Sequence, residues 1–447
     1  MTLKVVELND SAIGLGDASG IIVQSPGFAL ADGKLIQLGE EAERQARLKP
    51  TSSYNKYWHE LSMEPLSQQD RFRHAADIAH EHLLHLAEAA NLVGEQHQVI
   101  FAVPGNFSQQ QLAILLGIAR ETPLQPVGVA DSALAASVAL AKAERVIYVD
   151  MQLHQVVLTE LRMHEDRIAT AAVVQVPGIG SQNFMDLMMQ LTTDLFIQQS
   201  RFNPQHNAES EQQLYNALPN WLQQEATEQG SLELELNSGG NVYTAKLPRE
   251  SLIHSLSGHY AKLEQQLQAL TRGGAAQILL NPKIAGLPGI SAAVQHQGEL
   301  VVVPTGTVHS TCLEYHESIV AGEAGIRRVT SLPLRAEHKE AVLERAGSDE
   351  RPTHFLYQHR AFPLDGLRLK NGSQINGSSK ATLTLSVAGL PEELARVERR
   401  GNQVFLQTYE GDWLINAQTM SDVQELKLGD RVAIGDAELR VIQVANG

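Results

Sequence analysis

Residues Val99–Ala136 read VIFAVPGNFSQQQLAILLGIARETPLQPVGVADSALAA, and this stretch decides the fold. The apolar run Val99–Val103 predicts a buried strand. Ser108 is a common N-cap residue, and the periodic apolar residues after it predict an amphipathic helix over Gln109–Arg120. A second short strand and a small-residue helix are expected next, over Pro126–Val129 and Asp131–Leu140. The stretch therefore predicts an alternation of strands and helices.

Length and composition are ordinary for a globular protein. The 447 residues predict about two to four compact units, and 43% hydrophobic residues are enough for a large core. The single cysteine, Cys312, allows no intramolecular disulfide, and we expect it to be a small buried residue. The N-terminal residues do not resemble a signal peptide, and no run of about 18 apolar residues predicts a membrane span. These features indicate a cytoplasmic protein.

The net charge of −16 argues against a nucleic-acid partner. Proteins bind the phosphate backbone through clustered lysine and arginine residues. The densest basic group here contains only three side chains, those of Arg396, Arg399 and Arg400. We therefore expect protein partners rather than DNA or RNA.

Two β-rich segments, each followed by helices, predict an internal duplication. The first begins with strands at Leu3–Leu8, Ala12–Leu15 and Gly20–Ser25. The second begins with strands at Val146–Met151, Gln155–Arg162 and Ile168–Val176. The other expected elements are helices over Leu38–Pro50, Asp70–Leu92 and, capped by Ser181, about Gln182–Gln199, a hairpin over Leu232–Leu247, a strand at Gln277–Leu280 and a helix from near Gly289.

The C-terminal part differs in character. Residues 336–352 are strongly charged and predict a short helix within a linker. From residue 353 to 447, short apolar segments recur at intervals of roughly 8–12 residues, with Gly, Asn and Asp between them, which is typical of an all-β sandwich. The expected strands are Ala381–Val387, Ala395–Arg399, Gln403–Thr408, Trp413–Ile415, Gln424–Leu426, Arg431–Ile434 and Glu438–Val444.

The stretch quoted first resembles the segment of DnaK-type heat-shock chaperones that reads VPAxF…R…A…G…I.EP.AAA. The resemblance covers residues 1–335 and implies a two-lobed actin-like ATPase fold of the α/β class, built from duplicated ribonuclease H-like subdomains. In that family, ATP and Mg²⁺ lie between the lobes, at strand ends and helix N-termini. No segment after residue 335 resembles the substrate-binding domain, so a full chaperone cycle is not expected.

The first phosphate hairpin of that family, GIDLGTT, is matched by residues 5–11, VVELNDS. Glu7 stands at the acidic position that orients Mg²⁺, and Asn9 replaces a glycine. Asp10 replaces a threonine, and a carboxylate there would repel phosphate. Ser11 completes the match.

The second hairpin, DLGGGT, is matched by residues 150–155, DMQLHQ. Asp150 remains, although it is also explained as an ordinary turn-forming aspartate, and all three glycines are replaced. Asp131 matches a family glutamate, and Asn281 replaces an adenine-side glycine. The implied residues are Asp150, Asp131 and Glu7 for catalysis, Glu7 and Asp150 for Mg²⁺, and Asn9, Asp10, Ser11, Gly178, Gly180, Asn281 and Gly286 for nucleotide.

Residues 353–447 resemble a forkhead-associated (FHA) domain through their last strands. The matching residues are GDWLIN at 411–416 and GDRVAIG at 429–435. The family binds phosphothreonine through an arginine in an early loop and a later serine–histidine pair. Residues 371–379 contain no arginine, and Glu392 and Glu393 lie where a phosphate would bind. We therefore expect an FHA-like scaffold whose phosphopeptide recognition is lost or altered.

Two interpretations of the first domain remain open. Without the phosphate-binding glycines, the favoured one is a pseudo-ATPase that serves as a protein-interaction scaffold without nucleotide. The alternative is a divergent ATPase that still binds ATP and Mg²⁺, and a nucleotide-dependent filament is a third possibility. His80, His82 and His85 lie on one predicted helix, where solvated histidines are expected rather than a zinc site.

Overall fold

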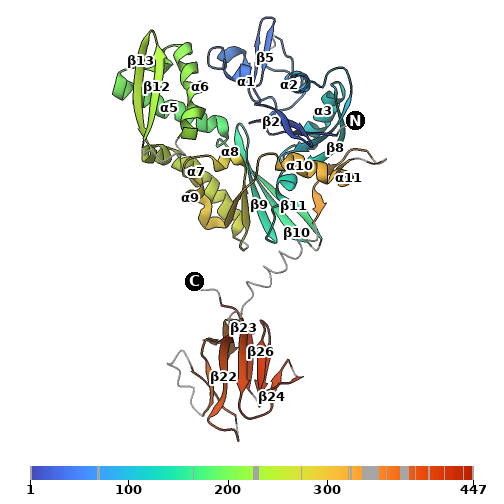
Figure 1. The fold of residues 1–447 in the computed structure, drawn as a ribbon, viewed down its shortest axis with the longest axis vertical. Coiled ribbons are helices and arrows are strands. Elements are labelled where there is room, and N and C mark those ends of the chain that lie inside the picture. The colour runs from blue at the N-terminus through green and yellow to red at the C-terminus, as the bar shows by residue number, and fades with distance from the viewer. Residues whose placement is uncertain are drawn as a thin grey trace. The chain divides into compact units, whose positions relative to one another are not determined.

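The computed structural model is a mixed α/β structure that divides into two compact units, residues 1–340 and 341–447 (Figure 1). The predicted linker at residues 336–352 lies almost wholly outside the described residues. The described residues are 3–67, 71–164, 166–224, 231–272, 274–320, 322, 325–334, 352–358, 360–372, 382–387, 389–400, 403–416, 418–435 and 437–444.

The first lobe of the first unit is built on a six-stranded sheet. Its three leading strands are antiparallel neighbours, and the first of them also pairs in parallel with the strand that contains Val99–Val103. Two further parallel strands complete the sheet. The order is β16 (Arg328–Val329), β8 (Leu124–Asp131), β7 (His97–Val103), β1 (Lys4–Glu7), β2 (Ile13–Asp17) and β3 (Gly20–Ser25).

The second lobe is built on a second six-stranded sheet with the same arrangement of its five main strands. Its first strand pairs antiparallel with the next one and parallel with a strand that comes much later in the sequence. The order is β15 (Glu299–Val302), β14 (Gln277–Leu280), β9 (Arg145–Met151), β10 (Gln155–His164), β11 (Arg167–Pro177) and β17 (Ser331–Pro333). The strands β9, β10 and β11 thus repeat the topology of β1, β2 and β3.

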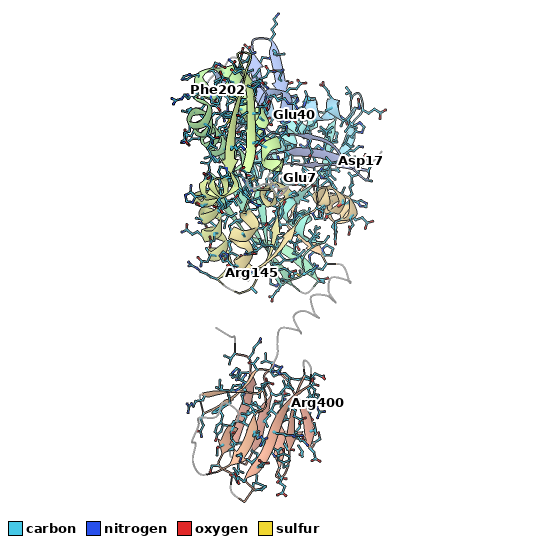
Figure 2. The ribbon with its side chains drawn as sticks, turned by 60° about the vertical axis from the view of Figure 1, so that its left-hand side comes forward. Glu7, Asp17, Glu40, Arg145, Phe202 and Arg400 are labelled. Carbon is cyan, nitrogen blue, oxygen red and sulfur yellow. The ribbon has the colours of Figure 1, made fainter. Side chains whose placement is uncertain are left out.

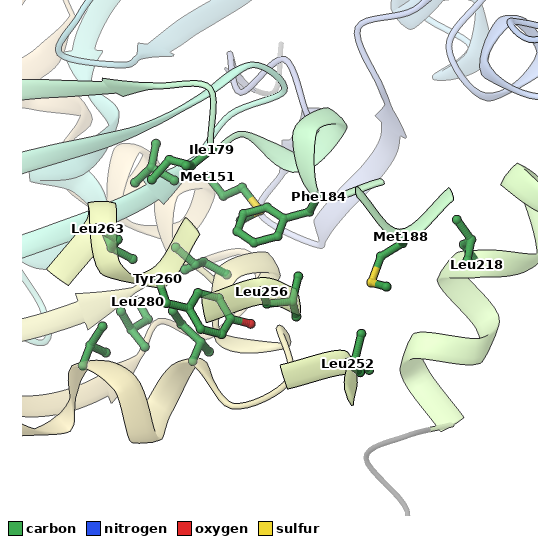
Figure 3. Close-up of a cluster of buried hydrophobic side chains, with 14 of the residues drawn as sticks. Met151, Ile179, Phe184, Met188, Leu218, Leu252, Leu256, Tyr260, Leu263 and Leu280 are labelled. Carbon is green, nitrogen blue, oxygen red and sulfur yellow. The ribbon is translucent and has the colours of Figure 1, made fainter. Parts of the chain in front are cut away.

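Each sheet has its own apolar core. Helices α2 (Ala75–Ala89) and α3 (Gln109–Arg120) supply side chains such as Leu83 and Leu115 to the core of the first lobe. Helices α5 (Ser181–Ser200) and α7 (Arg249–Thr271) do the same for the second lobe, where Phe184 and Tyr260 lie together (Figure 3). The other elements are α1 (Glu40–Glu43), α4 (Ser132–Ser137), α6 (Ala208–Gln224), α8 (Pro282–Ala285), α9 (Ile290–Val294), α10 (Thr307–Glu314), α11 (His316–Ile319), β4 (Ala29–Asp32), β5 (Leu35–Leu38), β6 (Ser53–Tyr54), β12 (Ser231–Ser238) and β13 (Asn241–Pro248).

The helix predicted over Gln109–Arg120 has the expected bounds. Ser108 caps it: its hydroxyl accepts the N–H of Gln111, whose side chain accepts the N–H of Ser108 in return. The small-residue helix is shorter than predicted, since α4 ends at Ser137 and Asp131 is its N-cap.

Three other helix predictions need correction. The helix expected over Leu38–Pro50 is a single four-residue helix, α1, because Leu38 belongs to β5 and the following residues form turns. The helix expected over Asp70–Leu92 begins only at Ala75, after the N-cap His74. The N-cap of α5 is Gly180, and Ser181 is its first residue.

The second unit is all-β in its described residues, with two sheets whose side chains share one core. Phe355 and Trp413 contribute from one sheet, and Leu369 and Leu406 from the other. The first sheet contains β19 (Arg360–Pro363), β18 (His354–Tyr357), β28 (Ala437–Ile442), β27 (Arg431–Ile434), β24 (Trp413–Ile415) and β25 (Gln418–Thr419). The second contains β21 (Thr382–Leu385), β20 (Arg368–Asn371), β22 (Glu393–Arg400), β23 (Gln403–Thr408) and β26 (Val423–Leu426).

Among the described residues, no helix is long and apolar enough to cross a membrane.

Candidate functional site

The two lobes meet where β1 and β9 end, and two short turns face each other there. We call residues 8–12, between β1 and β2, the first turn, and residues 152–154, between β9 and β10, the second turn. The amide of Asn9 joins them: its Nδ2 donates to Asp150 Oδ1 at 2.8 Å and to the Met151 carbonyl at 3.1 Å. Figure 2 shows that Glu7, at the end of β1, lies well inside the unit, whereas Asp17, at the end of β2, lies near its edge.

The next two residues of the first turn also cross between the lobes. Ser11 Oγ donates to the Met151 carbonyl at 3.1 Å. The N–H of Leu153, in the second turn, donates to Asp10 Oδ1 at 2.7 Å. Burial raises the pKa of the Asp10 carboxyl above its usual range, although the hydrogen bond from Leu153 opposes this shift. The second turn therefore directs a backbone N–H at a carboxylate of this same chain.

Lys283, an exposed residue, adds a cation at the same contact. It lies in α8, whose N-cap Asn281 donates from Nδ2 to Asp150 Oδ1 at 3.1 Å. The ammonium of Lys283 donates to the Ser11 carbonyl in the other lobe. Burial lowers the pKa of Lys283, while the Glu43, Asp10 and Asp150 carboxylates oppose this shift. No role was assigned to Lys283 from the sequence. Its place in the loop that matches the adenine-side loop of the chaperone family could have indicated one.

Glu7 and Asp150 are two carboxyl groups whose pKa values both lie above their ordinary values. Burial, together with the charge of Asp150, raises the pKa of Glu7 to about 8. Burial, together with the charge of Asp10, raises the pKa of Asp150 to about 7. These carboxyls fit the predicted Mg²⁺ site poorly, because Asp150 Oδ1 already accepts two amide N–H groups and the Lys283 ammonium lies nearby. Within the described residues, no three His, Cys, Asp or Glu side chains converge as metal ligands.

Asp131 does not join this group. Its side chain is fully buried, caps α4 by accepting the N–H groups of Ala133 and Leu134, and forms an ion pair with Arg328 at 2.6 Å. Burial raises the pKa of Asp131, while the charge of Arg328 opposes this shift. These partners occupy both carboxylate oxygens, so Asp131 has a structural role in the first lobe.

Of the three glycines predicted to contact nucleotide, Gly180 packs against the second turn. A Cβ atom there would lie 2.3 Å from the Gln155 nitrogen and 2.4 Å from the Leu153 oxygen. The carbonyls of the second turn also accept the first N–H groups of α5, from Ser181 and Gln182, both at 2.9 Å. Gly178 has a positive φ of 74° in open space, and Gly286 is the C-cap of α8.

Two small cavities lie on either side of these contacts. One, of about 170 Å³, is lined by Glu7, Asn9, Asn281 and Lys283 with the start of α10. The other, of about 260 Å³, is lined by Asp10 with residues from both lobes. Both volumes lie below the roughly 300–1,000 Å³ of typical small-molecule pockets, so neither cavity alone has the size expected of a nucleotide site.

A second set of contacts joins the lobes farther out, and we call it the outer contact. The guanidinium of Arg47, in the first lobe, pairs with Asp186 and, at 3.7 Å, with Glu211 of the second. It also lies over the ring of Tyr215, at 5.1 Å from the centroid, and the Tyr215 hydroxyl donates to Glu43 at 3.1 Å. The lobes are thus joined at the turns and again at the outer contact.

The histidine prediction is wrong for His82, which is fully buried. Its Nε2 lies 2.7 Å from Ser25 Oγ, and its Nδ1 lies 2.7 Å from the Tyr57 hydroxyl and accepts the indole N–H of Trp58. Burial lowers the pKa of His82 to about 3, so it is a neutral residue of the core. The prediction for Cys312 is confirmed, because this thiol is buried.

In the second unit, the described residues near the expected phosphate position interact with one another. Glu392 pairs with Lys370 at 3.0 Å. The side-chain amide of Asn371 donates to the carbonyls of Val387 and Leu390 and so holds the loop between β21 and β22. Most of the early loop at residues 371–379 lies outside the described residues, from residue 373 on.

No protein-family model matches this chain, and no curated protein matches it.

Proposed function

We propose that this chain is a DnaK-like protein whose actin-like domain does not use ATP and serves with its FHA-like domain as a protein-interaction scaffold. The fold part of the proposal is supported by the two sheets of the first unit, whose five main strands have the same order and directions. In such a duplicated fold, ligands are expected between the lobes, at the ends of the strands. That is where the first and second turns meet.

The observation that carries the functional proposal is the hydrogen bond from the Leu153 N–H to the Asp10 carboxylate. A nucleotide-binding hairpin offers such backbone N–H groups to a phosphate. Here the chain supplies its own anion to one of them. The side chains of Asn9 and Lys283 also bond across the lobes, so ATP would have to displace the buried hydrogen bond of Asn9 and the partly buried one of Lys283 to enter.

The residues retained from the chaperone pattern support a second candidate, a divergent ATPase with a nucleotide-dependent switch. Glu7 ends β1 and Asp150 is the last residue but one of β9, the equivalent strand of the other sheet, where a metal would lie in that family. The third residue that this mechanism needs, Asp131, is paired with Arg328 and caps a helix. This candidate is therefore the weaker of the two.

Release of phosphate from ATP separates these candidates. We expect the full chain with Mg²⁺ and ATP to release phosphate no faster than buffer alone, and Asp150→Ala to behave identically. A rate above background that Asp150→Ala abolishes would contradict the proposal and favour the divergent ATPase.

The scaffold role has its own test. The immobilised full chain is exposed to an extract of its native cells, and the retained proteins are compared with and without Mg²⁺ and ATP. We expect a defined partner to be retained equally in both conditions. Release of that partner by ATP would contradict a nucleotide-independent scaffold, and failure to retain any partner would contradict the scaffold role itself.

A further inference from the structure

The larger of the two interlobe cavities has a lining that suits a ligand other than a nucleotide. It measures about 260 Å³ and lies beside the Asp10–Leu153 hydrogen bond. Asp10, Trp58 and Asn106 line it from the first lobe, and Gln152 and Gln175 line it from the second. A molecule bound there would contact both lobes at once.

The polar part of the lining is dominated by amide side chains. Asn106 and Gln152 exchange two hydrogen bonds across the lobes, each 3.2 Å long. Each of these bonds uses one hydrogen of an NH₂ group that has two, so both amides can donate to a ligand as well. Gln175 is exposed at the edge of the cavity, and a fourth amide comes from Gln111. Amides both donate and accept, as hydroxyl groups do.

Among the described residues that line the cavity, Asp10 supplies the one carboxylate. One of its oxygens accepts the N–H of Leu153. Its second oxygen can accept a hydroxyl hydrogen, and such charge-assisted bonds are stronger than those between neutral groups.

The other walls are apolar and aromatic. Trp58 and Phe107 line the cavity together with Pro104 and Ile13. The indole N–H of Trp58 donates to the buried His82, which fixes the ring in place. A flat apolar wall of this kind suits the C–H face of a sugar ring, whose hydroxyl groups point outward to the amides.

The lining argues against the other classes of ligand. The described part of the lining contains no lysine or arginine, and phosphates and carboxylates are bound mainly through such residues. One carboxylate and one imidazole, from His59, are too few ligands for a metal ion. Four amides make the cavity too polar for a hydrocarbon.

We infer that this cavity binds a neutral polyhydroxylated molecule about as large as a monosaccharide. The volume of about 260 Å³ lies just below the roughly 300–1,000 Å³ of typical small-molecule pockets, which favours a small ligand. This inference rests on the proposed function, because Asp10 both lines the cavity and accepts the Leu153 N–H that a nucleotide would otherwise take.

Calorimetric titration of the full chain tests this inference. The probes are D-ribose, D-glucose, D-galactose and myo-inositol, each to 20 mM, with inorganic phosphate and choline as charged comparators. We expect saturable binding of at least one neutral probe and no binding of phosphate or choline. If none of the four neutral probes binds, or if a charged probe binds instead, the inference is wrong.

Variants locate the binding. Gln175→Ala changes an exposed residue at the edge of the cavity and should leave the fold unchanged. Asn106→Ala removes an amide from the wall. Each should weaken binding about tenfold, as expected for the loss of one or two hydrogen bonds. The matched control is Gln109→Ala, because Gln109 is exposed on α3 and does not line the cavity. Undiminished affinity in both cavity variants would place the probe elsewhere and overturn the inference.

Discussion

The first and second turns occupy the same place in two sheets of the same topology, yet they contribute different chemistry. The first turn supplies side chains, those of Asn9, Asp10 and Ser11. The second turn and the last residue of β9 before it supply backbone groups, the N–H of Leu153 and the carbonyl of Met151. The side chains of one turn therefore satisfy the backbone of the other, which makes the closed arrangement of the lobes independent of a ligand.

This difference explains how a duplicated fold can lose a ligand without losing its shape. Buried backbone groups need partners, and an unpaired one costs about 1–3 kcal/mol. In a nucleotide-binding protein the ligand supplies those partners when it is bound. Here Asp10 and Asn9 supply them permanently. The predictions below change one turn at a time and compare the losses of stability.

The largest loss of stability is expected from Gly180→Ala, because the added Cβ would collide with the backbone of the second turn. A Cβ at this position would lie within 2.5 Å of backbone atoms of Leu153, His154 and Gln155. The backbone of the second turn would have to move, and we expect a loss of about 3 kcal/mol or more. The measurement is urea unfolding in a Trp413→Phe background, so that the fluorescence comes from Trp58 and Trp221 of the first unit.

The matched control is Gly117→Ala, within helix α3. No atom lies within 4 Å of the added Cβ, so this change should be neutral or stabilising by up to about 1 kcal/mol. Equal losses for the two variants would show that Gly180 has no special contact with the second turn.

A smaller loss of stability is expected when the Asp10 carboxylate is removed from the first turn. Asp10→Ala leaves the buried N–H of Leu153 without an acceptor, and the first unit should lose about 2 kcal/mol. Asp10→Asn keeps an acceptor oxygen and should lose less than about 1 kcal/mol. Hydrogen exchange at Leu153 should be faster only in the alanine variant. If both variants exchange and unfold as the parent does, this hydrogen bond does not join the turns.

The carboxyl groups at the ends of β1 and β9 predict a pH dependence. The pKa of Glu7 in the folded chain is about 8, above its ordinary value of 4.5. Because the folded state binds this proton more tightly, its contribution to stability is complete below about pH 4.5 and is lost as the pH rises to 8. Glu7→Gln keeps a neutral group there and should be more stable than the parent by up to about 4 kcal/mol at pH 8 and by less than about 1 kcal/mol at pH 5. Parallel stability curves for the two proteins would contradict a protonated Glu7.

The smallest effect is expected at the outer contact. Arg47 pairs with Asp186 and Glu211, whose side chains keep 50% and 26% of their exposure. Exposed ion pairs contribute little, so Arg47→Ala should cost less than about 1 kcal/mol, and less still at high salt. A loss as large as that of Asp10→Ala would mean that the outer contact, rather than the turns, holds the lobes together.

Sequence patterns predicted the elements better than the contacts. The helix Gln109–Arg120 and the strand Gln403–Thr408 were predicted with their observed bounds, because an N-cap serine and a short apolar run between polar residues are local signals. Strands β18, β19, β20 and β25 were not predicted, because they are two to four residues long and carry little pattern of their own.

The candidate site was predicted in part. The substitutions at Asn9, Asp10 and Asn281 indicated that the phosphate-binding pattern had changed. They did not predict that these side chains bond across the lobes, since the sequence does not give the distance between residues 9 and 150. The burial of His82 and the pairing of Asp131 with Arg328 also depend on distant elements, so local periodicity could not reveal them.

Calorimetric titration of ATP with Mg²⁺ into the full chain tests most directly the claim that the chain fills its own interlobe site. The account predicts no saturable heat up to millimolar ATP. Binding at micromolar strength, equivalent to about −8 kcal/mol, would contradict it, because a nucleotide would then have displaced the contacts of Asn9, Asp10 and Lys283.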